Sequence, residues 1–229
     1  MRTYGQHCGL AAAMDLVGQR WSMLVVRELT PGPRRFTDIH EGLPGLATDV
    51  LAARLRELVQ AGVVEHRTMR SPVPAKVYAL TESGEALSVI ALRLADWGRP
   101  LLPGRPAEST AVRARWALQT MALSYGGGLG DGDYELVVDD EELTVRIAQD
   151  HAAVRYGPSA TAPIVRVSLS SKQFFTAVHD TRWLTRPRRG VEIVGERDIV
   201  VALFDALPLD VSTPVAAHGG PGESSKARL

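Results

Sequence analysis

The sequence predicts an α+β protein with two domains. The first hundred residues show helical apolar periodicity and two β-rich runs, and the second hundred show a helix, four strand-like runs and further helices. Between them, residues 99–106 contain three prolines and a glycine, which neither helix nor sheet accommodates easily. We therefore place the first domain at residues 1–99, a Pro-rich linker at 100–108 and the second domain at 109–207. Residues 208–229 are dominated by Ser, Gly, Pro and Ala and are expected to form a flexible tail.

Three apolar stripes predict the opening helices of the first domain. The first stripe predicts one long helix that ends before Pro31, and it consists of Leu10, Met14, Val17, Trp21, Leu24 and Val25. A short helix follows at residues 36–41 and is ended by the Gly- and Pro-containing residues 42–45. A longer helix is expected at residues 48–61, with Gly62 as its C-terminal stop and with Leu51, Leu55 and Leu58 facing inward.

A β-hairpin and a final helix complete the first domain. Residues 63–68 and 76–80 are β-rich, and the Pro-containing segment between them predicts a protruding loop. Thr81 is a suitable N-cap for the final helix, whose stripe includes Leu87, Leu94 and Trp97. Helix, short helix, turn, helix and hairpin is the element order of a winged helix-turn-helix domain, although a generic small α+β domain has the same order.

About residues 4–99 contain a series of short motifs: Cys8, GQRW at 18–21, REL at 27–29, RFTDI at 35–39, LPGL at 43–46, LAARLREL at 51–58, AGVV at 61–64 and VYALTESG at 77–84. In this order and spacing, the motifs resemble the HxlR family of winged-helix transcriptional regulators, which are relatives of MarR. The resemblance implies a homodimer that is built through the first and last helices of this domain.

The longer helix would lie in the major groove of double-stranded DNA, since that groove is wide enough for a helix and carries most sequence information. Its outer face and flanks, the start of the short helix and the hairpin loop supply candidate contacts to bases or phosphates. These residues are Arg34, Arg35, Thr37, Thr48, Asp49, Ala53, Arg54, Arg56, Arg67, Arg70 and Lys76. A two-fold dimer would read a roughly palindromic operator, with half-sites about one helical turn apart.

Two features of this surface allow different interpretations. Asp49 could accept a hydrogen bond from a cytosine amino group, or it could simply favour the helix N-terminus electrostatically. The arginines of the hairpin could contact the flanking groove, or they could form an ordinary hydrated face. Because Ala47 and Ala52 stand where the family often has polar residues, phosphate contacts and DNA shape would carry much of the binding.

Cys8 is the single cysteine, so the chain forms no intramolecular disulfide. We expect it to be a small buried packing residue. The alternative is a redox role, since some HxlR-type proteins sense oxidants or electrophiles through cysteine, and a reactive cysteine needs a stabilised thiolate.

The second domain is expected to begin with a helix that Ser109 or Thr110 caps and that runs to Tyr125. Strands are expected at residues 134–138, 143–148, 152–156, 164–168 and 191–194, with helices at 172–179 and 199–207 and with Ser170 or Ser171 as a cap. The glycines at 126–128 predict a turn rather than a phosphate-binding loop, because they follow a helix and no P-loop lysine accompanies them.

Late segments of the second domain resemble a sterol-carrier-protein-like domain, in which helices cover one sheet over an apolar cavity. The resemblance spans about residues 110–207, and it lies in VRVS at 165–168, KQFF at 172–175 and VEIVGERD at 191–198. The fold implies a cavity for a small hydrophobic or amphiphilic effector, although a filled core would show the same pattern. The expected lining is Trp116, Met121, Tyr125, Phe174, Phe175, Trp183 and Phe204.

Composition excludes several other classes of protein. The chain has 229 residues with 26 basic and 26 acidic side chains, which argues against a simple polybasic nucleic-acid binder. The charge is nevertheless unevenly distributed, since residues 1–107 carry a net charge of +3 and residues 108–229 a net charge of −3. We expect a cytoplasmic protein without a membrane partner, and we expect no catalytic site, no metal site and no cofactor.

The domain order predicts a one-component transcriptional regulator. The first domain would bind operator DNA as a homodimer, and the second would sense a small, partly apolar effector. The alternative is a cytoplasmic small-molecule or lipid carrier, or a scaffold, that uses the winged domain only to dimerise.

Overall fold

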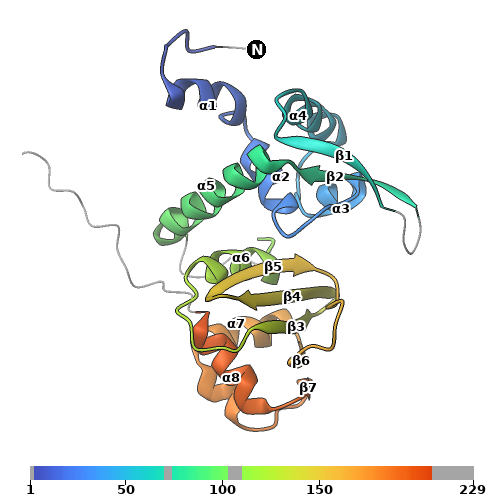
Figure 1. Cartoon of the computed structure of the whole chain (residues 1–229), viewed down its shortest axis with the longest axis vertical. Helices are drawn as coiled ribbons and strands as arrows, with labels where there is room; N and C mark the ends of the chain where they lie inside the picture. The colour runs from blue at the N-terminus through green and yellow to red at the C-terminus, as the bar shows by residue number, and fades with distance from the viewer. Residues whose placement is uncertain (1–2, 70–73, 103–109, 208–229) are drawn as a thin grey trace, which may run out of the picture.

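The computed structural model describes residues 3–69, 74–102 and 110–207. In this part of the chain an N-terminal helical domain with a β-hairpin lies above a C-terminal domain built on one sheet (Figure 1). Arg70, most of the expected linker (103–108) and the expected tail (208–229) lie outside the described residues.

The N-terminal domain has the element order expected for a winged helix-turn-helix. Its elements are α1 (Gly9–Val17), α2 (Ser22–Leu29), α3 (Phe36–Glu41), α4 (Thr48–Gln60), β1 (Val64–Met69), β2 (Ala75–Leu80), α5 (Glu82–Gly98) and the 3-10 turn η1 (Arg99–Leu101). Strands β1 and β2 form an antiparallel ladder. Thr81 caps α5 as expected, because its hydroxyl oxygen accepts from the Gly84 N–H at 3.1 Å.

The single long helix expected at the N-terminus is wrong. The chain breaks between α1 and α2, where Trp21 has a left-handed φ of 82°. After the break, Val25 and Val26 of α2 point into the core and are buried, whereas Leu10 on α1 is 72% exposed. The apolar stripe therefore belongs to two helices that face different surroundings, which its spacing alone did not reveal.

The core of the N-terminal domain lies under α2 and α4. Leu51, Leu55 and Leu58 of α4 are buried as expected, and they pack with Val25 and Leu29 of α2. This packing fixes the inner face of α4 and leaves its outer face to solvent.

The C-terminal domain is an α+β unit with a five-stranded mixed sheet. Its elements are α6 (Ala114–Leu123), β3 (Gly132–Val138), β4 (Glu141–Ala148), β5 (His151–Tyr156), β6 (Val165–Leu169), α7 (Ser171–His179), the 3-10 segment η2 (Thr181–Thr185), β7 (Glu192–Val194) and α8 (Arg197–Ala206). The strand order is β5-β4-β3-β6-β7, in which β3 and β6 are parallel and the other pairs antiparallel.

The first helix of this domain starts later than expected. Helix α6 has Arg113 as its N-cap residue. Of the two expected caps, Thr110 is exposed and outside the helix, and Ser109 lies outside the described residues. Ala114 and Arg115 are buried, so α6 begins where the chain reaches its packing surface. The cap at Ser170 is confirmed, because its hydroxyl oxygen accepts from the Gln173 N–H that follows in α7.

The two remaining global features concern membranes and metals. None of the described helices is both long and apolar enough to cross a bilayer. Within the described ranges, no group of three or more His, Cys, Asp or Glu side chains is arranged to hold a metal ion.

Candidate nucleic-acid interface and domain junction

The outer face of α4 lies on the side of the N-terminal domain that is remote from the C-terminal domain (Figure 1). Thr48, Asp49 and Arg56 are exposed there, and Ala53 is half-buried. Arg54 is also half-buried, and its Nη1 lies 2.7 Å from Oε2 of Glu57 one turn along the helix. The face therefore presents one uncommitted arginine, Arg56, among the α4 residues expected to contact DNA.

The start of α3 and the hairpin add further exposed groups. Arg35 and Thr37 are exposed at the first turn of α3, and Lys76 is exposed on β2. Arg67 on β1 is exposed but pairs with Glu65 at 2.5 Å. In Figure 1 the hairpin of β1 and β2 extends away from the helices of its own domain and from the C-terminal domain, as a wing would.

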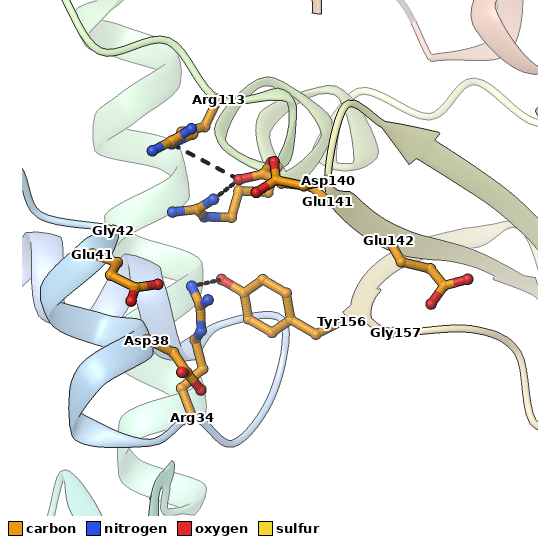
Figure 2. Close-up of a pocket in the computed structure, with 11 residues that line it drawn as sticks. Arg34, Asp38, Glu41, Gly42, Arg113, Asp140, Glu141, Glu142, Tyr156 and Gly157 are labelled. Atoms are coloured by element: carbon orange, nitrogen blue, oxygen red, sulfur yellow. Dashed lines mark hydrogen bonds and ion pairs between the residues drawn. The ribbon is translucent and has the colours of Figure 1, made fainter. Parts of the chain in front are cut away.

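Arg34 lies somewhere else, at the junction between the two domains. Its Nη1 donates to Oε2 of Glu28 at 3.2 Å. The same nitrogen donates to the Tyr156 hydroxyl at 3.3 Å, a contact that Figure 2 shows. Its guanidinium carbon also lies 4.4 Å from the centre of the Tyr156 ring. The structure thus separates Arg34 from the other expected phosphate contacts.

Glu28 on α2 is the centre of this junction, and its side chain is fully buried. Oε1 accepts from the Trp116 indole N–H at 2.7 Å and from Arg27 Nη2 at 2.8 Å. Oε2 accepts from Arg115 Nε at 3.1 Å, in addition to Arg34. A carboxylate of the N-terminal domain is therefore held by two side chains from the start of α6 in the C-terminal domain.

Tyr156, at the end of β5, contacts the same helix α2. Its hydroxyl donates to the backbone carbonyl of Glu28 at 3.1 Å, and its N–H donates to the carbonyl of Pro31 at 3.4 Å. Burial, followed by the nearby Glu28 charge, raises the pKa of Tyr156 to about 12. The phenol is therefore a neutral donor at physiological pH.

Arg115 links Glu28 to a second carboxylate, Glu141 at the start of β4. Arg115 is only 5% exposed and forms ion pairs with both carboxylates, and Arg113 approaches Glu141 at 3.9 Å. Gly42 completes the packing, since a Cβ at this position would overlap with Oε2 of Glu28. The backbone after α3 and the buried carboxylate are in direct contact.

These charges are stable only because they are paired. Burial lowers the pKa of the Arg27 guanidinium, and the charge of Glu28 opposes this effect. Arg27 also stacks on the Trp116 ring, with its guanidinium carbon 4.0 Å from the ring centre. Removing one member of such a cluster would leave buried charges without a partner.

Sequence reasoning missed Glu28, although the sequence contains a signal. Glu28 is three residues after Val25 and one before Leu29, so it lies on the core-facing side of α2. A carboxylate on an apolar helix face predicts a buried ion pair. Nothing in the sequence indicates that its partners come from residues 115 and 116, some 87 positions later.

The expected apolar ligand site falls inside the packed second domain. Met121, Phe174 and Phe204 belong to its buried core. Tyr125, Phe175 and Trp183 pack against that core, and Trp116 points to Glu28. A cavity of about 400 Å³ lies at the domain junction, and none of these seven residues lines it.

Cys8 is exposed, so the expectation of a buried packing residue is wrong. It is the N-cap residue of α1, ahead of the first helical turn, which leaves its side chain outside the core. Hydrogen bonds from the backbone N–H groups of Ala11 and Leu10 lower the pKa of its thiol.

Comparison with known proteins places relatives on the N-terminal domain. The family described as HxlR-like helix-turn-helix matches residues 16–105. The HTH-type transcriptional regulator YodB of Bacillus subtilis is 35% identical over 88 residues, which is 38% of this chain and 79% of YodB. The regulator YdeP of the same organism is 35% identical over 92 residues, 40% of this chain and 71% of YdeP. A solved structure of YodB in its reduced form is 31% identical, covers 44% of this chain and 100% of YodB, and has a TM-score of 0.37.

Proposed function

This chain belongs to the HxlR-like helix-turn-helix family, and from that membership we propose a one-component transcriptional regulator that binds operator DNA as a homodimer and responds to a small effector through its C-terminal half. The relatives reported above are transcriptional regulators, not enzymes. The observation that carries the proposal is an α4 that is anchored by buried leucines and leaves its outer face free for a groove.

Exposed charges around α4 support the DNA-binding part. Arg56 on α4, Arg35 at the start of α3 and Lys76 on β2 are exposed, so they are available to phosphates. The proposed contacts also include Thr37, Thr48, Asp49, Ala53, Arg54 and Arg67. Arg34 is the exception, since the junction already uses its guanidinium.

Exposed apolar side chains support the homodimer. Leu10 on α1 and Ile90, Leu94 and Trp97 on α5 are all more than half exposed. Apolar side chains gathered on two helices are typical of a surface that another protein covers. We propose that a second copy covers them, and the molar mass of the chain in solution tests this.

The C-terminal half is proposed as the sensing domain because it is attached directly to the helix-turn-helix. Glu28 and Tyr156 connect α2 to α6 and β5, so a movement of the second domain reaches the helix that supports α4. The sterol-carrier-like identity and the apolar ligand site stay predictions. A partly apolar ligand in that core would have to displace Met121, Phe174 or Phe204, and titration with a fluorescent fatty-acid probe tests this.

Cys8 supports a second candidate function, a response to oxidants or electrophiles. Its thiol is exposed and its pKa is lowered by helix N-terminal N–H groups, which favours the thiolate that reacts. The test is the rate of Cys8 alkylation relative to free cysteine, together with operator affinity before and after alkylation.

A gel-shift titration with the promoter of the chain's own gene and of the adjacent gene tests the main proposal. We expect a shift whose affinity falls with salt, because neutralised phosphates release counterions. Arg56→Ala should weaken the shift, and Lys172→Ala, on an exposed position of the C-terminal domain, should not. The absence of a shift with both promoters would refute operator binding, and a shift that is insensitive to salt would refute binding through the proposed phosphate contacts.

A further inference from the structure

The junction between the two domains contains a cavity that no expected site accounts for. Its volume is about 400 Å³, which falls within the range of small-molecule pockets. Figure 2 shows its two sides, with Glu41 and Arg34 from the N-terminal domain facing Tyr156 and Glu141 from the C-terminal domain.

Both walls of this junction cavity belong to functional elements. One wall is α3 with the residues on either side of it, and it includes Arg34, Asp38, Glu41 and Gly42. The other wall is the turn before β4 and the end of β5, including Asp140 and Tyr156. A molecule in the cavity would therefore contact the first helix of the helix-turn-helix and the sheet of the second domain together.

Two of the three arginines that line the cavity are already occupied. Arg34 donates to Glu28 and Tyr156, and Arg115 is bound between Glu28 and Glu141. Arg113 lies 3.9 Å from Glu141, and its Nε has no hydrogen-bond partner among the described residues. An anionic ligand would have to compete with the partners of Arg34 and Arg115 for their positive charge.

The carboxylates of the cavity are not occupied to the same degree. Five acidic residues line it against three arginines. Among the residues that the structure describes, neither Glu41 nor Asp140 forms an ion pair. Oε2 of Glu141 is buried and has no hydrogen-bond partner among them either. The cavity thus offers hydrogen-bond acceptors and an excess of negative charge.

We propose that this junction cavity binds a small organic cation that carries a primary amine or a guanidinium group. The cationic group pairs with Glu41 and Asp140, two exposed carboxylates, one from each domain. Charge-assisted hydrogen bonds of this kind are the stronger ones in proteins.

The site gives the location and the chemical class of the effector in the proposed function. Its role in regulation therefore rests on that proposed function. A cation between Glu41 and Asp140 links α3 to the β4 turn, and it favours the docked arrangement of the two domains. A ligand changes operator affinity only if it binds one arrangement better than another. Coupling of this type typically changes affinity by about 5- to 150-fold.

Isothermal titration of the full-length protein, without DNA, tests the site. The probes are agmatine, putrescine and spermidine, with citrate and glutarate as anions of comparable size. We expect saturable binding of at least one cation at one site per chain, and no binding of either anion. Glu41→Gln and Asp140→Asn should each weaken that binding by about tenfold or more.

Glu192→Gln is the matched control, because Glu192 is an exposed acid on β7 outside the cavity lining. Its affinity should equal that of the unmodified chain. Failure of all three cations to bind, binding of an anion instead, or equal affinities in the Glu41→Gln and Glu192→Gln variants would each overturn the proposal. Because no DNA is present, these results are independent of the gel shift that tests the regulator.

Discussion

Arg34 and Arg35 are neighbours in the sequence, yet they lie in opposite regions of the molecule. Arg35 is exposed at the start of α3, on the DNA-facing side proposed above. Arg34 is turned to the domain junction, where it pairs with the buried Glu28 and with Tyr156. Residue type alone therefore does not assign a role to an arginine. A hydrated arginine is available to a ligand, whereas a desolvated one is held by its partners.

The outer face of the N-terminal domain and the domain junction also differ in how much folding stability is lost when a charged side chain is removed. On the outer face, ion pairs such as Arg67–Glu65 are exposed and contribute about 1 kcal/mol or less. At the junction, Glu28 is completely buried and accepts hydrogen bonds from four side chains. We therefore expect stability to depend on the junction and DNA affinity on the outer face.

Glu28→Ala is the change with the largest expected effect. It leaves Arg115 and the Trp116 indole without their buried acceptor, and breaking a buried pair costs about 3–5 kcal/mol. Urea denaturation measures the free energy of unfolding. The control is Glu65→Ala, which removes an exposed pair and should cost about 1 kcal/mol or less. Similar losses in the two variants would contradict the assignment of the junction as the stabilising region.

Tyr156→Phe sharpens the comparison through pH. Below pH 10 the Tyr156 proton is bound in both the folded and the unfolded chain, so this residue adds no pH dependence. Between about pH 10 and 12 the unfolded chain loses that proton and the folded chain keeps it, because the folded pKa is about 12. The free energy of unfolding of the unmodified chain therefore falls as pH rises through this range, by about 2–3 kcal/mol in total from the Tyr156 phenol.

The measurement is the free energy of unfolding of the unmodified chain minus that of Tyr156→Phe, taken from pH 9 to 11.5. The difference should shrink across the upper part of this range. Tyr4→Phe, at a ring that is 60% exposed, serves as the control. A difference that stays constant with pH would show that the Tyr156 phenol is not shielded in solution.

Arg35→Ala has the smallest expected effect on stability, and it separates the two regions most directly. The logarithm of operator affinity falls linearly with the logarithm of salt concentration, and removing one phosphate contact should reduce the steepness of that line by about one. The free energy of unfolding should change by no more than about 0.5 kcal/mol, because the side chain is exposed.

Arg34→Ala should instead lower folding stability and leave DNA binding unchanged. It should cost about 1–3 kcal/mol of stability, since the side chain donates to Glu28 and Tyr156, and it should leave the salt slope unchanged. Gel shifts at several salt concentrations and urea denaturation of both variants check the pair. If Arg34→Ala changes the slope and Arg35→Ala does not, the two regions have been assigned the wrong way round.

Much of the fold could be predicted from local patterns. The hairpin, the caps at Thr81 and Ser170 and the inward leucines of α4 depend on neighbours within one or two turns, and the structure confirms them. The break at Trp21 was not predictable from spacing, because it depends on which face of α2 the core accepts. Cys8 was placed wrongly for a related reason, since composition cannot tell that α1 keeps this residue outside the core.

The family and the order of the helices and strands, apart from the break at Trp21, follow from the sequence alone, because they depend on periodicity and on short motifs. Only the tertiary structure decided that Glu28, Arg34, Arg115 and Tyr156 meet at one junction and that a cavity lies beside them. Their partners are separated by up to 128 residues in the chain, and such contacts arise from the docking of two domains. Local propensity contains no information about that docking.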